Sequence, residues 1–309
     1  MRVLYVIQLF QQILTAEKSL IMTTDPSKNH TYILDPESPV EMARLIHFDQ
    51  ITTKAMGGPL TEQPPEVIAS LHYVLDLACG PGGWVLDVAF AYPEMDVAGV
   101  DISKTMINYA GARARTQKLT NASFGIMDIT HTLDFSESIF DLVNARFING
   151  VLHRDAWAPF LAECRRLLRP GGILRLTEMV DVGVSNSPAF EQMSAWLSKV
   201  MWKLGYGFSP DGSGLGITSM LSRLLRTAGY MDIQRAAHTL EFSIEEEEAW
   251  TGFYHNMEVG YALAKPIFVK TEVALQEEFE QCYQQMLIEM HAATFCGLWD
   301  FVTVWGKKP

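Results

Sequence analysis

The chain has 309 residues, of which 48% are hydrophobic, and its formal net charge at pH 7 is −12. That length and composition support a full hydrophobic core, in one large domain or in one domain with a cap. An acidic chain without a dense basic patch repels polyanions, so no nucleic acid partner is expected. No apolar run reaches the roughly 20 residues that a membrane-spanning helix needs, so no membrane span is expected.

The N-terminal stretch "MRVLYVIQLFQQIL" combines one arginine with a short apolar run, a pattern that raises the question of a signal peptide. Three glutamines interrupt the run, so an amphipathic helix, or an extension upstream of a start at Met22, is favoured. The four cysteines share no metal-ligand spacing, and no metal site is expected. They are typical of reduced thiols in a cytoplasmic protein.

From about residue 70 onward, patterns typical of strands and helices alternate. The expected strands cover residues 72–79, 96–101, 122–130, 140–147, 173–180, 231–242 and 300–308, and the expected helices cover 83–93, 103–117, 155–168 and 220–229. The first strand, "HYVLDLAC", is a continuous apolar run, as in a central parallel strand covered on both faces. This alternation predicts an α/β fold with an open, doubly wound, mostly parallel sheet.

Three segments fall outside the alternation, namely residues 1–69, 185–217 and 244–295. The remaining residues, which form the expected core, are 70–184, 218–243 and 296–309. We expect the three segments to meet as a helical cap over the carboxyl ends of the strands, with 185–217 and 244–295 as the part that covers the substrate. Large apolar residues recur there at helical spacing, which suits either packing onto the sheet or an apolar pocket.

A glycine turn follows the first strand, in "VLDLACGPGGW" (74–84). Glycines at Gly80, Gly82 and Gly83 let backbone N–H groups approach a ligand at a helix N-terminus, although a glycine pair alone also suits a plain tight turn. Asp101 follows Gly80 by twenty-one residues. At the end of the second strand its carboxylate can accept both ribose hydroxyls, so the two features together predict a nucleoside cofactor.

The cofactor is not expected to be a dinucleotide. The dinucleotide fingerprint needs a small residue at position 85, where this chain has Val85. Asp76, just before the turn, would repel a pyrophosphate. A ligand that carries an ammonium group and a positively charged sulfur would instead favour that carboxylate.

Five motifs, "VLDLACGPGG", "GVDIS", "IMDIT", "FDLVNARF" and "LLRPGGILRLTE", resemble in order those of the class I S-adenosylmethionine-dependent methyltransferases, of small-molecule type. The resemblance covers about residues 70–182 and the last two strands. It implies a Rossmann-like, seven-stranded sheet whose last strand is antiparallel and lies between strands five and six. It also implies S-adenosylmethionine as cofactor, S-adenosylhomocysteine as product, and a cofactor cover formed by 1–69, with a helix within 37–60.

The resemblance assigns cofactor-binding roles residue by residue. They fall on Asp76, Ala78, Gly80, Gly82, Asp101, Ile102, Met106, Met127, Asp128, Ile129 and Asn144. Asp101 is implied as the ribose ligand and Asp128 as the acceptor for the adenine amino group. Asn144, at the end of strand four, is implied to offer a carbonyl to the methionine ammonium. Asp128 also suits a turn residue, and Asn144 an ordinary loop residue.

Methyl transfer from a sulfonium is an in-line displacement, helped by a base when the acceptor must lose a proton. Residues past the ends of strands four and five are therefore the catalytic candidates, namely Glu178, His153 and Arg146. A partly buried Glu178 suits a base with a raised pKa, or a structural carboxylate paired with Arg146 or Arg175. His153 also suits a capping or surface residue.

The acceptor pocket is expected to be apolar. Its candidate residues are Phe147, Met193, Trp196, Tyr254 and Met257. The sequence therefore predicts a cytoplasmic enzyme of secondary metabolism, monomeric or homodimeric, that methylates an apolar small molecule at an O, N or C atom. Two alternatives stay open, a protein or RNA methyltransferase and a non-catalytic nucleoside-binding protein of the same fold.

Overall fold

The computed structural model of the protein describes residues 31–309, so the expectation for the N-terminal stretch lies outside the described residues. Within them, the strands are β1 (Tyr73–Leu77), β2 (Asp96–Asp101), β3 (Ala122–Ile126), β4 (Phe140–Arg146), β5 (Leu168–Met179), β6 (Val184–Ser185), β7 (Met231–Glu241) and β8 (Gly297–Lys307). They form one sheet in the order β3-β2-β1-β4-β5-β8-β6, with β7 also paired to β8.

The sheet is mostly parallel. β1 pairs in parallel with β2 and β4, β2 with β3, and β4 with β5. β8 is antiparallel to both β5 and β7, so the prediction of an antiparallel last strand between the fifth and sixth is confirmed. The two-residue strand β6 was not expected from the sequence.

The strand order reverses between β1 and β4. Ligands of open α/β sheets bind outside the carboxyl ends of the strands at such a point.

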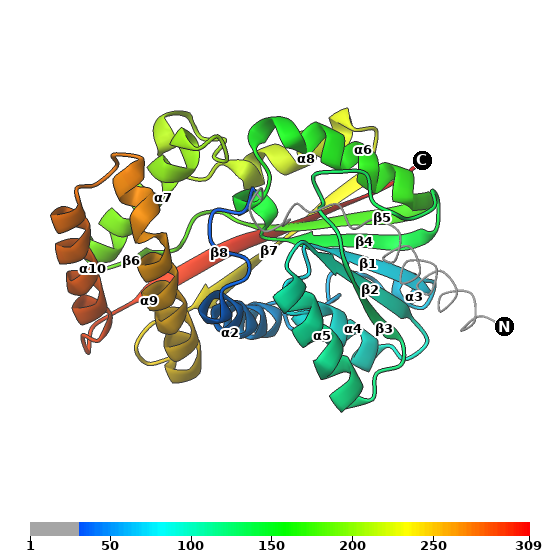
Figure 1. Ribbon diagram of the computed structural model, residues 1–309, viewed down its shortest axis with the longest axis horizontal. Coiled ribbons are helices and arrows are strands. Elements are labelled where there is room, and N and C mark those ends of the chain that lie inside the picture. The colour runs from blue at the N-terminus through cyan, green and yellow to red at the C-terminus, as the bar shows by residue number, and fades with distance from the viewer. Residues whose placement is uncertain (1–30) are drawn as a thin grey trace. The chain divides into compact units, whose positions relative to one another are not determined.

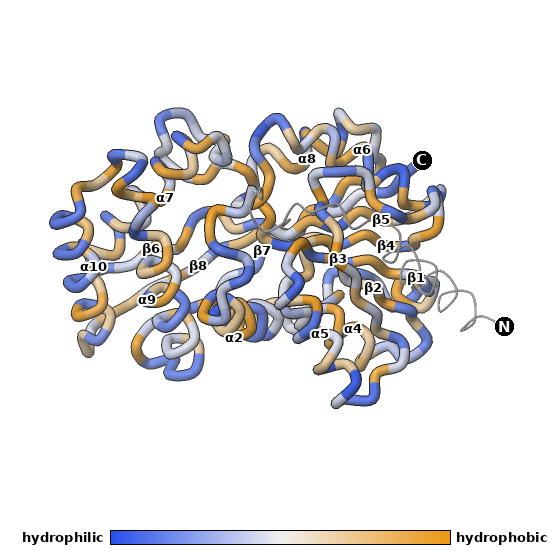
Figure 2. The backbone as a smooth tube through the Cα atoms, in the orientation of Figure 1, coloured by the Kyte–Doolittle hydropathy of each residue, from blue (hydrophilic) through white to orange (hydrophobic). Residues whose placement is uncertain are grey.

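Helices cover both faces of the sheet. α4 (Gly83–Ala91) and α5 (Lys104–Gln117) lie on one side, and α6 (Trp157–Leu167) and α8 (Ile217–Thr227) lie on the other (Figure 1). The central strands are largely hydrophobic along their length (Figure 2), which explains why helices cover both faces of the sheet. Strands that are apolar on both faces need cover on both.

Three helices, α7 (Pro188–Lys203), α9 (Glu247–Lys270) and α10 (Gln276–Met290), lie together around β6, and α2 (Pro39–Ala55) lies between α9 and α4 (Figure 1). A short α3 (Pro65–Ile68) and the 3-10 turns η2 (Ile148–Gly150), η3 (Arg154–Ala156) and η4 (Pro210–Gly212) complete the described helices. α2 begins where the Ser38 hydroxyl accepts from the Glu41 N–H, and it ends before Gly57, whose φ is 76°. The expected helix within 37–60 is confirmed.

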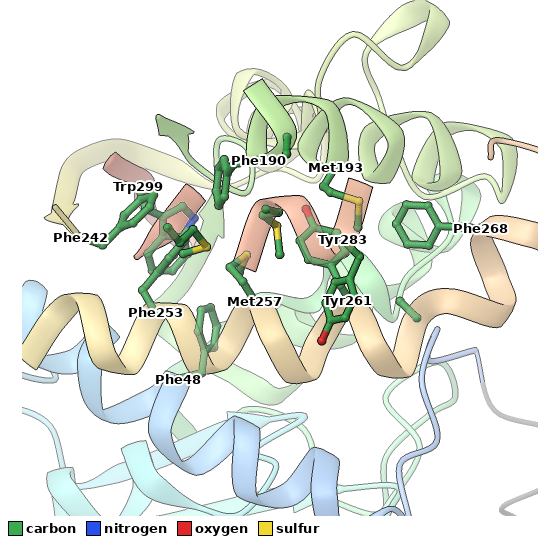
Figure 3. Packing of buried hydrophobic residues seen from close by; sticks show 14 of the residues in the cluster. Phe48, Phe190, Met193, Phe242, Phe253, Met257, Tyr261, Phe268, Tyr283 and Trp299 are labelled. Atoms are coloured by element: carbon green, nitrogen blue, oxygen red, sulfur yellow. The ribbon is translucent and has the colours of Figure 1, made fainter. Parts of the chain in front are cut away.

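The helical end has its own apolar core. Aromatic and methionine side chains from α2, α7, α9, α10 and β8 form one buried cluster (Figure 3). Phe242 and Phe253 stack at 3.9 Å between ring centroids, and Phe48 lies 5.2 Å from Trp299. In residues 31–309 no helix is both long and apolar enough to span a bilayer.

Candidate cofactor edge and acceptor cavity

The turn between β1 and α4 has an unusual backbone. Ala78, Gly80 and Gly82 have positive φ angles of 54°, 52° and 76°. A Cβ atom on Gly82 would lie 2.7 Å from both Ala110 Cβ and Phe124 Cε1, so only glycine fits there. A left-handed alanine is rare, and such conformations concentrate at ligand sites. The turn brings backbone N–H groups to the N-terminus of α4.

Asp101, at the end of β2, holds this turn in place. Its Oδ2 accepts from the Gly80 N–H (2.8 Å), and its Oδ1 accepts from the Ser103 N–H (2.9 Å). Burial raises the pKa of the carboxyl above its usual range. The carboxylate therefore lies against the glycine turn, where the sequence prediction of a ribose ligand requires it.

The other predicted cofactor residues lie near the carboxyl ends of β1 to β4, which we call the cofactor edge. The Met127 N–H donates to the Asp101 carbonyl (3.0 Å), which brings the segment after β3 beside the end of β2. Asp128 accepts from the Thr130 N–H (2.9 Å), so it does form a local turn. Met106 and Ile129 are buried, whereas Ile102 and Met127 are half-buried.

A buried polar chain crosses the sheet behind the turn. Asp76 accepts from Asn144 Nδ2 (2.7 Å), Asn144 Oδ1 accepts from Arg175 Nη1 (2.6 Å), and Arg175 Nε donates to Glu62 Oε1 (2.6 Å). Asn144 lies two residues before the end of β4, directly opposite Asp76 in register, and not at the strand end where the sequence prediction put it. We therefore assign it to holding Asp76. Burial raises the pKa of Asp76 to about 7, against the opposing effects of Arg146 and Asn144.

Helix α2 covers the glycine turn. A Cβ atom on Gly83 would collide with the Asp49 carboxylate, which shows how closely α2 approaches α4. Arg146 donates to Asp49, and its Nη1 donates to Thr53 Oγ1 (3.1 Å). The guanidinium is thus bound to α2, and Arg146 is not in the cavity lining described next.

A cavity of about 180 Å³ lies between α2, α9, the segment after β4 and the ends of β5 and β8, and most of its surface is apolar. Phe147 and Met257, which are candidates for the acceptor pocket, line it together with the catalytic candidate Glu178. The other lining residues are Tyr32, Ile33, Leu34, Arg44, Leu45, Phe48, Asn149, Gly150, Met179, Val182, Leu197, Met201, Leu215, Asn256, Gly260, Tyr261, Ala264 and Trp299.

Glu178 is the carboxylate of this cavity, and its side chain is only 1% exposed. Its Oε1 accepts from the N–H groups of Ile148 (2.8 Å) and Asn149 (3.1 Å). Its Oε2 has no hydrogen-bond partner among residues 31–309. Burial raises its pKa to about 8, against the effect of the two N–H groups. The alternative of a partner arginine is wrong, because Arg146 pairs with Asp49 and Arg175 with Glu62.

Several predicted residues lie elsewhere. Met193 packs in the apolar core between helices (Figure 3), because its face of α7 meets α10. Trp196 packs against the outside of that core, and Tyr254 stacks on Trp250 at 5.2 Å between ring centroids. The His153 ring stacks on Tyr206 at 4.3 Å. None of the four is in the cavity lining, and helical spacing alone did not distinguish core from cavity.

Four functional candidates were missed by the sequence reasoning. Asn149 and Tyr261 line the cavity, and both have side-chain polar atoms without a partner among the described residues. Glu62 and Asp49 pair with the arginines of β5 and β4. Only Asn149 had a usable signal, since it follows a strand of the switch point by three residues. The others come from helices or loops whose contacts depend on the tertiary structure.

Comparison with known proteins finds a methyltransferase domain in part of the chain. Residues 74–172 match a methyltransferase domain family. The chain is 25% identical to demethylmenaquinone methyltransferase from Lactococcus lactis over 177 residues, 53% of this chain and 68% of that protein. It is 28% identical to trans-aconitate 2-methyltransferase from Methylobacterium radiotolerans over 213 residues, 68% of this chain and 70% of that protein. Other curated relatives are matched over about half of their length or less.

Solved structures resemble the chain at low sequence identity. YcgJ from Bacillus subtilis superposes with a TM-score of 0.48 at 14% identity, covering 79% of this chain and 99% of that one. A sarcosine dimethylglycine methyltransferase homologue from Galdieria sulphuraria gives a TM-score of 0.46 at 12% identity, covering 91% and 94%. The matched domain, the curated relatives and the confirmed strand order support a class I S-adenosylmethionine-dependent methyltransferase.

Proposed function

We propose that the protein transfers the methyl group of S-adenosylmethionine to an apolar small molecule bound in the cavity, with Glu178 as the base. The observation that carries this proposal is the lining of the cavity. It is apolar over most of its surface, it lies at the carboxyl ends of β4 and β5, and it holds one buried carboxylate with an unpartnered oxygen. Small-molecule sites typically combine such apolar walls with a few fixed polar groups.

The chain's own residues suit the cofactor. Gly82 lets the turn pack closely against Ala110 and Phe124 at the N-terminus of α4, and Asp101 supplies a carboxylate beside the turn. Asp76 lies deeper, where an ionised carboxylate would attract the ammonium group of the methionine moiety. S-adenosylmethionine supplies an electrophilic methyl group, and α2 lies over this edge to exclude water.

Glu178 suits proton removal from the acceptor. Two backbone N–H groups fix Oε1, which leaves Oε2 as the proton acceptor. In the reaction a bond forms between the acceptor atom and the methyl carbon while the sulfur–methyl bond breaks. The sulfonium becomes a thioether, and the acceptor's proton passes to Glu178. Since its pKa is raised to about 8, we expect turnover to increase as pH rises from 6 to 8.

The first experiment is calorimetric titration with S-adenosylhomocysteine, with NADH alongside. Micromolar binding of the first and none of the second is expected, and no binding of the first would contradict the cofactor edge. The second experiment incubates the protein and radioactive S-adenosylmethionine with lipophilic small molecules and measures label in an organic extract. Label in added protein or RNA would favour a macromolecular acceptor, and cofactor binding without any transfer would favour a non-catalytic binder.

Glu178→Gln tests the base. We expect turnover to fall about 100-fold or more with unchanged S-adenosylhomocysteine affinity, because general bases contribute roughly that factor. Glu241→Gln, an exposed glutamate at the end of β7, is the matched control and should leave turnover unchanged. Normal turnover of the Glu178→Gln variant would mean that Glu178 is a structural carboxylate and not the base.

A further inference from the structure

The cavity has a polar end made of two neighbouring residues. The Asn149 N–H donates to Glu178 Oε1 (3.1 Å), which holds the two residues together. Their side chains are 3% and 1% exposed. Glu178 Oε2 and both amide atoms of Asn149, Oδ1 and Nδ2, have no hydrogen-bond partner among residues 31–309. A buried polar atom without a partner destabilises the fold, so three together point to a ligand that satisfies them.

The three atoms differ in what they require. When Glu178 is ionised, its carboxylate oxygen accepts a hydrogen bond, whereas the Asn149 amide donates through Nδ2 and accepts through Oδ1. A lone hydroxyl leaves part of this set unsatisfied. Two oxygen functions on adjacent atoms of one ligand complete it, with one hydroxyl directed at Glu178 and the second oxygen at Asn149.

The rest of the wall suits a flat, uncharged body. The Phe147 ring lies 5.0 Å from Phe48 and 5.6 Å from Trp299, and all three line the cavity. Arg44 is the cation in the lining, but it is already engaged. It donates to Glu41 (2.6 and 2.7 Å) and to Asn256 Oδ1 (2.6 Å). A phosphate or carboxylate on the acceptor would therefore meet no available cation there and would face Glu178.

We infer that the acceptor is an uncharged ring compound with two adjacent oxygen functions, of which one hydroxyl binds Glu178 and the other oxygen binds Asn149. This inference rests on the proposed function, because it takes the cavity as the acceptor site. Asn149 then acts as the residue that distinguishes a dioxygenated ring from a singly hydroxylated one.

The test measures the binding of four matched probes to the protein saturated with S-adenosylhomocysteine. They are naphthalene, 2-naphthol, 2,3-dihydroxynaphthalene and 2-naphthoate. We expect affinity to rise about fivefold with each hydroxyl, because a net hydrogen bond contributes about 1 kcal/mol. The naphthoate should bind more weakly than 2-naphthol. Equal affinities for naphthalene and the diol, or tightest binding of the naphthoate, would overturn the inference while leaving the proposed function in place.

Asn149→Ala gives the residue-level test. We expect it to abolish the advantage of the diol over 2-naphthol and to keep the advantage of 2-naphthol over naphthalene. Met257→Leu, at an apolar position of the same cavity, is the control and should preserve both steps. An unchanged S-adenosylhomocysteine affinity shows that the variant is folded. If S-adenosylhomocysteine binds but none of the uncharged probes does, the cavity is not the acceptor site, and the proposed function fails together with the inference.

Discussion

The candidate cofactor edge and the candidate acceptor cavity differ in how their polar groups are satisfied. At the cofactor edge, Asp101 accepts two backbone N–H groups, and Asp76 is the end of a hydrogen-bonded chain that runs to Glu62. In the cavity, Glu178, Asn149 and Tyr261 retain atoms without a partner in the described chain. The first region is organised before any ligand binds, whereas the second needs a ligand to complete its hydrogen bonds.

The two regions also differ in origin. The cofactor edge comes from the ends of β1, β2, β3 and β4, which the parallel pairing brings together. The cavity is assembled from α2, α7, α9, the segments after β4 and β5, and the beginning of β8. Ligand recognition at the edge therefore follows from strand order, and recognition in the cavity follows from how helices pack.

The largest expected effect is at the cofactor edge. Asp101→Ala should weaken S-adenosylhomocysteine binding by 100-fold or more, because two hydrogen bonds to a charged acceptor, each about 1.5–3 kcal/mol, are lost. Calorimetry measures this directly. Asp134→Ala removes an exposed aspartate away from the turn and should change nothing. Unchanged binding to Asp101→Ala would contradict the assignment of this edge to the cofactor.

Glu62→Gln tests the buried polar chain. It leaves the fully buried Arg175 without a charged partner, and breaking such a pair costs about 3–5 kcal/mol of unfolding free energy. Urea denaturation measures the loss. A variant with wild-type stability would mean that Arg175 does not depend on Glu62.

Glu178→Gln tests the buried carboxylate of the cavity, which has no ion-pair partner among the described residues, in contrast to Glu62. The pKa of Glu178 is about 8 in the folded protein and about 4.5 when unperturbed, so the unfolded chain releases this proton first. Between those values stability falls as pH rises. Glu178→Gln removes that loss, and its stability advantage over the wild type should grow from pH 5 to pH 8. An advantage that shrinks over this range would contradict the buried, unpaired carboxylate.

A tenfold effect is expected from the titration of Asp76. Its pKa of about 7 means that the attractive, ionised form becomes populated as pH rises. Affinity for S-adenosylmethionine should therefore increase by up to about tenfold from pH 6 to pH 8. Asp76→Asn should bind more weakly at pH 7 with a flat profile. If the affinity of the wild type were equally independent of pH, Asp76 would not be the group that attracts the cofactor's ammonium.

The smallest effect separates two neighbours on α7. Leu197 lines the cavity and Trp196 does not, although both are half-buried. Leu197→Ala should weaken 2-naphthol binding about fivefold, the equivalent of roughly 1 kcal/mol of lost apolar contact. Trp196→Ala should leave it unchanged. If Trp196→Ala weakened 2-naphthol binding more than Leu197→Ala, Trp196 would belong to the acceptor pocket, as the sequence predicted.

Local patterns determined the sheet and its cofactor edge. The apolar run before the glycine turn, the spacing of Gly80 and Asp101, and the order of the later strands were sufficient, because parallel strands bring their ends together without further information. Glu178 was found in the same way, as a carboxylate that ends an apolar strand.

Only the tertiary structure decided the cavity. Met193 and Met257 both stand on apolar helical stripes and both belong to the buried core, yet of the two only Met257 also lines the cavity. Neither Arg146 nor Arg175 pairs with Glu178, because Asp49 and Glu62 approach them from segments far away in the sequence. Hydrophobic periodicity tells which face of a helix is buried, but whether that face meets another side chain or an empty space depends on how the helices pack.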